Sequence, residues 1–109
     1  MTKEKLLNLT LNELKAIFRV LPTSNTPHRF GYKNFWYGDY YYIPDYDIHV
    51  RIGQSYSTIV TIEVSAFVDG ELYDVLYEIG KWSTTTSKQV TQFYNQISNA
   101  NARVLIELK

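Results

Sequence analysis

The chain has 109 residues but no cysteine, only one methionine and two histidines, His28 and His49. Without cysteine there is no disulfide, no thiolate zinc site and no thiol nucleophile. Two histidines are a poor basis for a metal site, and we expect no metal and no cofactor. No apolar run approaches the roughly 20 residues that cross a bilayer. The N-terminal residues include acids and no small-residue cleavage site, so we expect neither a membrane span nor a secretory signal.

What the chain does have is an ordinary globular composition, with 45% apolar and 20% charged residues, and enough length for a single domain over residues 1–109. Its net charge of zero is unevenly distributed. Residues 1–38 carry six basic residues and two acidic ones. Residues 39–80 carry one basic residue and eight acidic ones, and residues 81–109 carry four basic residues and one acidic one. Either folding mixes these blocks over the surface, or the middle block forms an acidic face for a basic partner.

The first predicted element is a helix that begins at residue 11. Thr10 and Glu13 have the spacing of a capping box, and Pro22 ends the helix because it cannot donate to the hydrogen-bond ladder. Residues 3–9 are expected to add a helical turn or two. Apolar residues recur at helical spacing between these limits: Leu11, Leu14, Phe18 and Leu21.

The composition changes in the next segment: nine of the 17 residues from 30 to 46 are aromatic. This density favours strands. Residues 47–52 then alternate polar and apolar, which predicts a half-buried strand with a polar outer face. We expect this strand to pair with the next one, with Val50 opposite Ile62 and His49 opposite Glu63.

The strongest structural prediction is a hairpin over residues 58–79. Asp69-Gly70 is a type I′ turn signal, and the residues on both sides of it alternate with period two. Pairing across this turn places apolar residues opposite one another on one face, while the other face is mixed. The predicted pairs are Val68–Glu71, Ala66–Tyr73, Val64–Val75, Ile62–Tyr77 and Val60–Ile79.

A second helix is predicted after Trp82, with Thr86 and Gln89 at capping-box spacing, followed by a short strand around Val104 and Ile106. The expected fold class is therefore α+β, in the order α-β-β-β-β-α-β. We expect an antiparallel sheet of four to five strands, with the N-terminal and C-terminal helices packed on one of its faces.

Two groups of residues suggest chemistry. Hydroxyl and lysine side chains at the start of the second helix would suit a phosphate, although the hydroxyls alone would serve as caps. These residues are Lys81, Thr85, Thr86, Ser87 and Lys88. The polar strand face places a histidine among carboxylates, which suits acid–base chemistry, but we expect an ordinary solvated face with ion pairs. Its residues are Asp47, His49, Arg51, Glu63, Asp74 and Glu78.

A third group lies in the aromatic segment, where tyrosines alternate with aspartates. Tyrosine offers a large contact area at low entropic cost, and so many rings cannot all be buried in a small domain. Base stacking is disfavoured because the aspartates would repel phosphates. We therefore expect a protein-binding surface, with self-association as a variant. Its residues are Tyr37, Asp39, Tyr40, Tyr42, Asp45, Tyr46 and Asp47.

The stretch 55–97 resembles small proteins of phages and plasmids of low-GC Gram-positive bacteria. These proteins carry an aromatic residue, then S-x-T-T-S-[KR]-H, and a helix with a phenylalanine near its middle. The matching residues are Trp82, Ser83, Thr85, Thr86, Ser87, Lys88 and Phe93, and Gln89 stands where those proteins often have histidine. The resemblance implies a mobile-element origin and a bacterial cytoplasm.

Together these features predict a non-enzymatic interaction protein, in its most specific form an inhibitor of a host defence nuclease. An acidic, tyrosine-rich surface would occupy the basic groove that normally receives nucleic acid. The alternative is a small nucleic-acid-binding protein that uses the basic start of the second helix.

Overall fold

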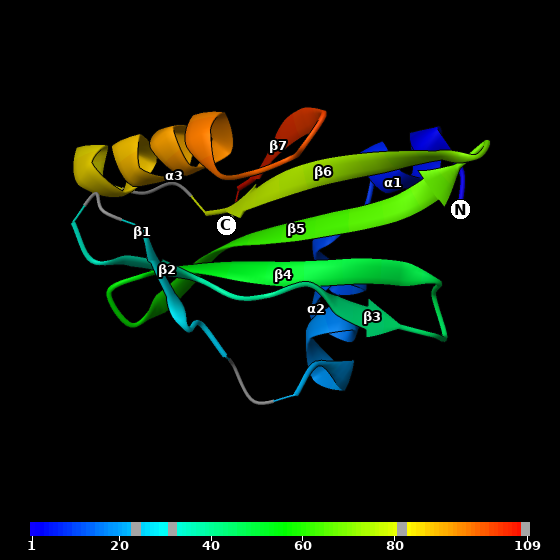
Figure 1. Cartoon of the computed structure of the whole chain (residues 1–109), viewed down its shortest axis with the longest axis horizontal. Helices are drawn as coiled ribbons and strands as arrows, with labels where there is room; N and C mark the ends of the chain where they lie inside the picture. Colours follow the sequence, from blue (N-terminus) through cyan, green and yellow to red (C-terminus); the bar gives the residue numbers. More distant parts are fainter. Residues whose placement is uncertain (23–24, 31–32, 81–82, 108–109) are drawn as a thin grey trace.

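The computed structural model describes residues 1–22, 25–30, 33–80 and 83–107 (Figure 1). Its strands form one sheet in the order β1-β2-β4-β5-β6-β7, and β3 pairs with β4 beside β2. The helices are α1 (Lys3–Leu7), α2 (Leu11–Val20) and α3 (Thr84–Gln96). The strands are β1 (His28–Phe30), β2 (Phe35–Tyr37), β3 (Tyr41–Ile43), β4 (Ile48–Ser55), β5 (Thr58–Val68), β6 (Glu71–Ile79) and β7 (Ala102–Ile106).

The predicted α+β class is confirmed, but the sheet formed by the described residues has seven strands rather than four to five. The aromatic segment supplies three short strands, β1, β2 and β3, of which β2 and β3 pair with opposite halves of β4. All strand pairs are antiparallel except β6 with β7, which is parallel because α3 connects the two strands.

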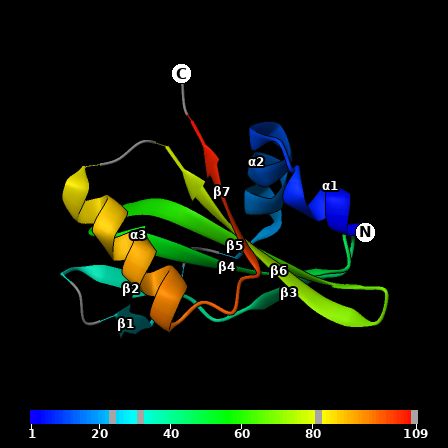
Figure 2. The same cartoon turned by 90° about the horizontal axis from the view of Figure 1, so that it is seen from above.

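The helices lie on opposite faces of the sheet, which corrects the expectation that both cover one face (Figure 2). The core under α1 and α2 is aliphatic and includes Leu14, Ile62 and Val64. The core under α3 is more aromatic and includes Phe35, Leu76 and Phe93. On β6, Val75 and Tyr77 face the first core while Leu76 between them faces the second, so both faces of the central hairpin are buried.

The N-terminal helical region forms as predicted. Both halves of the Thr10–Glu13 capping box are present, and α2 ends at Val20, before Pro22. The separate short α1 precedes it. The Tyr77 hydroxyl donates to the carbonyl of Leu6 and accepts from the backbone N–H of Leu9 at 3.0 Å, so β6 fixes the connection between the two helices. Among the described residues, no helix is both long and apolar enough to cross a membrane.

The hairpin register is confirmed from Thr61–Glu78 through Val68–Glu71. Asp69 and Gly70 both have positive φ, 51° and 81°, as a type I′ turn requires. The side chains of the last predicted pair do not share a face, since Val60 lies in the core under α3 and Ile79 in the core under α1 and α2. A register shift between Gly53 and Gln54 in the β4–β5 pair accompanies the change of face at Val60.

The register of β4 differs by two residues from the prediction. Val50 pairs with Val64, Arg51 with Glu63 and His49 with Ser65. The strand extends beyond the predicted residues 47–52, because β4 continues to Ser55 and a tight turn leads to β5 at Thr58. A shift of two residues leaves every side chain on its expected face.

Helix α3 begins two residues earlier than the predicted capping box. Ser83 is the N-cap and accepts a hydrogen bond from the backbone N–H of Thr86. Thr86 and Gln89 are themselves buried, and the Ser55 hydroxyl donates to the Gln89 carbonyl oxygen at 2.6 Å. The predicted Thr86–Gln89 box is therefore wrong, since both side chains attach α3 to β4. Trp82 lies outside the described residues.

Candidate functional site

The polar strand face is not solvated, contrary to the expectation from its sequence. Arg51, Glu63 and Asp74 are 9%, 1% and 2% exposed. Together with Tyr40 they form what we call the carboxylate cluster, which lies between the sheet and the C-terminal end of α3. The other three residues of the polar strand face, Asp47, His49 and Glu78, are not part of this cluster. Glu78 pairs with Arg103 of β7 at 2.8 Å.

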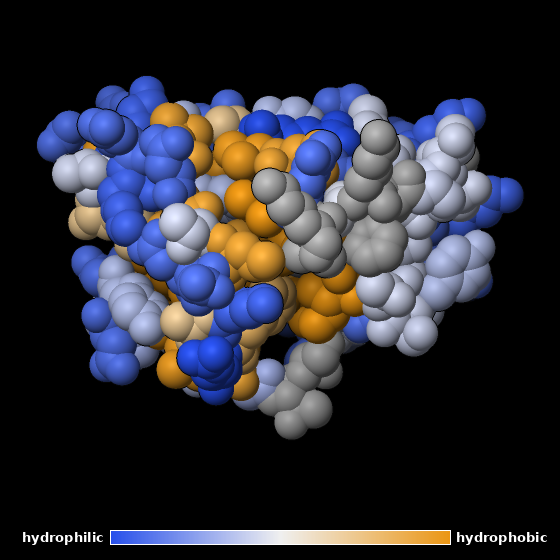
Figure 3. Space-filling model, turned by 180° about the vertical axis from the view of Figure 1, so that it is seen from behind, coloured by the Kyte–Doolittle hydropathy of each residue, from blue (hydrophilic) through white to orange (hydrophobic). Residues whose placement is uncertain are grey.

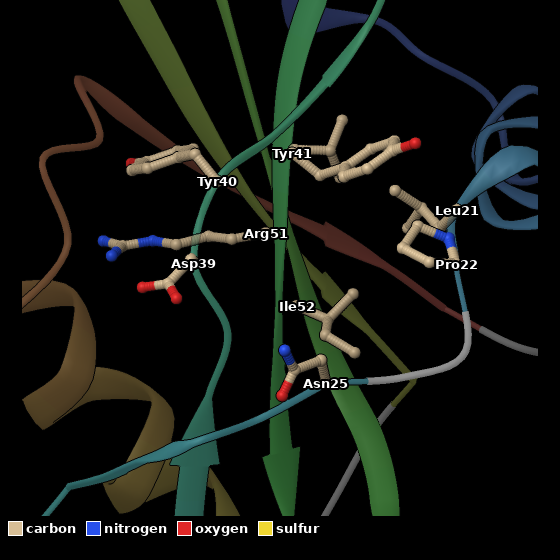
Figure 4. Close-up of a pocket in the computed structure, with 9 residues that line it drawn as sticks. Leu21, Pro22, Asn25, Asp39, Tyr40, Tyr41, Arg51 and Ile52 are labelled. Carbon is tan, nitrogen blue, oxygen red and sulfur yellow. The ribbon is translucent and has the colours of Figure 1, made fainter.

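Arg51 is the cation of this cluster. Its Nε lies 3.0 Å from Glu63 Oε1, and a terminal nitrogen lies 3.4 Å from the carbonyl oxygen of Ile97 at the end of α3. The guanidinium also lies over the Tyr40 ring, 4.4 Å from its centroid, with Phe93 on the α3 side at 5.4 Å. Figure 4 shows the side chains of Tyr40 and Arg51 running alongside each other, away from α2. Aromatic rings and one carboxylate thus compensate the buried charge.

The Tyr40 hydroxyl connects the two carboxyl groups. It lies 2.5 Å from Glu63 Oε2 and 2.7 Å from Asp74 Oδ2. A hydroxyl has one proton to donate, so one of the two acids must donate in turn. Burial and the nearby Glu63 raise the pKa of Asp74 to about 8. The resulting chain at neutral pH runs from the Asp74 carboxylic acid to Tyr40 and from Tyr40 to the Glu63 carboxylate.

The other groups of the cluster agree with this arrangement. Burial raises the pKa of Glu63, but the neighbouring Asp74 and Tyr40 side chains and the charge of Arg51 outweigh burial and hold this pKa below its ordinary value. Burial, followed by the hydrogen bond to Glu63, raises the pKa of Tyr40 above its ordinary value, so the phenol stays protonated. The cluster is therefore neutral as a whole at pH 7.

We expect the stability of the protein to decline between about pH 4 and pH 8 because of Asp74. Its folded-state pKa, about 8, lies above the ordinary value of 3.8, so in this window the folded chain holds a proton that the unfolded chain releases. The limiting slope is about 1.4 kcal/mol per pH unit. The stabilisation is complete below pH 4 and is lost as the pH rises through 8. Urea denaturation at pH 5 and pH 8 measures it.

Asp74→Asn should flatten this decline, because an amide can replace the neutral acid in the bond to Tyr40 without titrating. The matched control is Asp69→Asn, an exposed aspartate at a positive φ that asparagine tolerates. Equal pH slopes for Asp74→Asn and the unchanged protein would contradict the proton position given above.

A hollow of about 330 Å³ opens beside the carboxylate cluster. It lies towards the β5–β6 turn, at the end of the sheet that α3 does not cover (Figure 2). We call it the hairpin pocket. On its floor, Ser65 and Asp74 are cross-strand neighbours, and the paired residues Phe67 and Leu72 are 66% and 53% exposed. Oδ1 of Asp74 is buried and has no hydrogen-bond partner among the described residues. The pocket is lined by Tyr40, His49, Ser65, Phe67, Leu72, Asp74 and Asn99.

The predicted partner-binding residues divide into two groups. Tyr42 and Tyr46 are exposed, as expected for some of these rings, and Tyr41, which was not singled out, is exposed as well. Tyr37 and Tyr40 are instead half-buried beside Arg51. These rings cover the buried Arg51 cation but remain partly exposed, so their place in a partner-binding surface stays a prediction.

The three aspartates of that set are all exposed but occupy different positions. Asp39 precedes β3 and lies 2.5 Å from Nε2 of His28. Asp45 and Asp47 follow β3 in the turn to β4, where Asp47 accepts a hydrogen bond from the Tyr42 hydroxyl at 2.7 Å. The Tyr42 ring also packs on the His49 ring, 4.9 Å between centroids. Through Tyr42, Asp47 is thus linked to His49, which lines the hairpin pocket.

The described residues of the predicted phosphate site differ in exposure. Lys81 lies outside the described residues, and Thr86 is buried, with its hydroxyl oxygen 3.4 Å from that of Ser55. Lys88 is exposed, while Thr85 and Ser87 are half-buried. The Thr86 hydroxyl therefore lies between Ser55 of β4 and the N-cap Ser83, and binding of a phosphate at this helix start stays a prediction. Within the described part of the chain, no three His, Asp or Glu side chains are grouped to hold a metal.

On the face seen from behind in Figure 3, hydrophobic residues gather near the centre. The hollow that Leu21, Pro22 and Ile52 line with Tyr41 has a volume of only about 130 Å³ (Figure 4). The hairpin pocket is larger and combines exposed apolar walls with a buried acid. Sequence reasoning missed Phe67 and Leu72, although their position as an apolar pair on the mixed face beside the turn was visible.

Comparison with known proteins adds no relative: no family model, no curated protein and no solved structure matches the chain. The fold and the site define a small α+β domain with one open end of its sheet. That end carries exposed aromatic and aliphatic side chains around a pocket with a buried acid.

Proposed function

We propose that this protein is a non-enzymatic binding protein that docks a basic partner protein on the open sheet end. We use this name for Tyr42, His49, Phe67 and Leu72 with the flanking turns 44–47 and 69–71. The observation that carries the proposal is the exposure of Phe67 and Leu72 beside the hairpin pocket. Apolar side chains that adjoin one another on a surface commonly mark interaction sites.

The charge of the two turns supports a basic partner. Asp45 and Asp47 lie in one turn, and Asp69 and Glu71 lie in or beside the other, all four exposed. Neither turn contains a lysine or arginine. Acids around an apolar centre steer a basic protein towards it and repel nucleic acid.

The particular form of this proposal is an inhibitor of a host nuclease, encoded by a phage or plasmid. A nuclease presents a basic groove to its nucleic acid, and the open sheet end offers the opposite charge with aromatic contacts. The exposed Tyr42 and Tyr46 would supply the rim of such an interface.

The test is affinity capture from a nuclease-treated lysate of a low-GC Gram-positive bacterium, compared between variants. A partner that binds the unchanged protein should be lost at least tenfold with Phe67→Ser, and weakened with Asp45→Lys plus Glu71→Lys. Asp39→Lys is the control, because this exposed residue lies at the other end of β3 and should leave capture unchanged. Capture that is insensitive to Phe67→Ser contradicts the proposal.

Self-association is measured in the same series by light scattering. A dimer of the unchanged protein that Phe67→Ser converts to monomer would show that a second copy covers the open sheet end. The occupant of the open sheet end would then be a second copy of this chain and not a basic partner protein.

A further inference from the structure

We propose that the hairpin pocket receives an arginine side chain of the partner, whose guanidinium pairs with Asp74. This inference rests on the proposed function and names the partner chemistry of the same surface. The pocket volume of about 330 Å³ is at the lower end of the range of small-ligand sites, about 300–1,000 Å³, and so suits a single side chain.

The first argument is the unpartnered oxygen. Asp74 Oδ2 bonds to Tyr40, but the buried Oδ1 has no hydrogen-bond partner among the described residues. Buried acceptors without a donor are uncommon and destabilising. Asn101 does not supply the missing donor to Oδ1, because its hydrogen bonds go to the backbone N–H and carbonyl of Asp74. A donor from outside would satisfy Oδ1.

The second argument is the charge count around Asp74. Arg51 and His49 face it from β4, Glu63 from β5, and Tyr40 from the segment before β3. The segment 97–101, which closes the pocket from the side of α3, carries no charge. Among the described residues near Asp74, one permanent cation thus serves two carboxyl groups, and its short contact is to Glu63. A second cation would let Asp74 ionise.

The third argument favours arginine over lysine. The protein already holds one guanidinium in this way, since Arg51 bonds to Glu63 while stacking on Tyr40. The hairpin pocket offers the same combination of an acid and aromatic rings. Asp74 is its acid, and the rings are those of Phe67, His49 and Tyr40. A planar, weakly hydrated guanidinium suits such surroundings better than a strongly hydrated ammonium.

Access to Oδ1 requires a small movement of the pocket lining, because this atom is buried. Phe67 and Leu72 in the lining are exposed and can change rotamer rapidly. Entry of an arginine therefore needs no rearrangement of the sheet.

Binding is expected to release one proton, because the carboxylic acid of Asp74 becomes a carboxylate beside the guanidinium. The affinity should then rise with pH by up to about tenfold per unit below pH 8, and level off above it. A ligand that only fills the apolar part of the pocket would show no such dependence.

The experiment titrates N-acetyl-arginine amide into the full chain and follows backbone amide shifts by NMR at pH 6, 7 and 8. We expect weak, saturable binding with shifts centred on Ser65, Phe67, Leu72 and Asp74, and tighter binding at pH 8. The neutral citrulline analogue and N-acetyl-lysine amide should bind at least fivefold more weakly. Equal binding by either compound, or no saturable binding at these residues, overturns the inference.

Asp74→Asn provides the matched variant, since its amide preserves the bond to Tyr40. It should weaken the arginine probe at least fivefold at pH 8 and remove the pH dependence, while Glu4→Gln, at an exposed acid of α1 outside the open sheet end, should change neither. Arginine binding that is unaltered by Asp74→Asn would show that the carboxylate is not the ligand.

The two proposals fail separately. If Phe67→Ser abolishes partner capture but the arginine probe does not bind, the docking surface stands and the arginine assignment fails. If the probe binds as expected but Phe67→Ser leaves capture unchanged, the pocket is a guanidinium site and the proposed docking function fails.

Discussion

Replacing Arg51 with methionine is expected to lower the free energy of unfolding by about 3–5 kcal/mol. Methionine retains much of the aliphatic stem but removes the charge that compensates Glu63, which is 1% exposed. The Glu63 carboxylate would then remain buried with neutral donors only, so it must either be charged at high cost or take up a proton. Urea denaturation at pH 7 measures the loss, as a lower midpoint at an unchanged slope.

A second substitution identifies the cause. Arg51→Met combined with Glu63→Gln should recover at least half of the lost stability, because an amide at this position is neutral and still accepts the hydrogen bond from Tyr40. Glu63→Gln alone should be destabilising, since it strands the Arg51 cation. If the double variant is as unstable as the sum of the single ones, the two charges are not coupled and the cluster has been misinterpreted.

Val64→Asp is expected to leave no cooperatively folded protein at 25 °C. Val64 is fully buried in the central strand β5, between Val50 of β4 and Val75 of β6. An aspartate here would have no cation or free donor within the aliphatic core. We expect a cost of about 5 kcal/mol or more, which is comparable to the whole stability of a domain of this size. Circular dichroism should show no thermal transition.

Phe67→Asp is the matched control on the same strand. Its side chain lies on the other face and is largely exposed, so this variant should keep its melting transition, with a loss of about 1 kcal/mol or less from strand propensity. A normal transition for Val64→Asp would contradict the burial and pairing of β5.

What the sequence determined by itself is local. The register of the β5–β6 hairpin followed from the Asp69-Gly70 turn and period-two alternation, because a slip by one residue would expose the whole apolar face. The limits of α2 followed from Thr10, Glu13 and Pro22, whose effects act within one helical turn. The exposure of Tyr42 and Tyr46 followed from the excess of rings over available core.

The register of β4 required tertiary structure, because the two alternatives differ by two residues and place identical faces inward. The choice depended on a tight turn at residues 56–57 and on the shift at Gly53. The sequence pattern likewise did not predict that the helices lie on opposite faces of the sheet. The mixed face of the hairpin contains Leu76, but also charged residues that, taken one at a time, indicate contact with solvent.

The site was decided almost entirely by tertiary structure. Glu63 and Asp74 are expected on a solvated surface when considered singly, and only long-range contacts with Arg51 and Tyr40 make their burial tolerable. The same contacts leave the buried Oδ1 of Asp74, a residue that lines the hairpin pocket, without a hydrogen-bond partner among the described residues. A sequence specifies which residues can be buried through their intrinsic polarity. Which charges can be buried depends on partners that only the folded chain brings within hydrogen-bond distance.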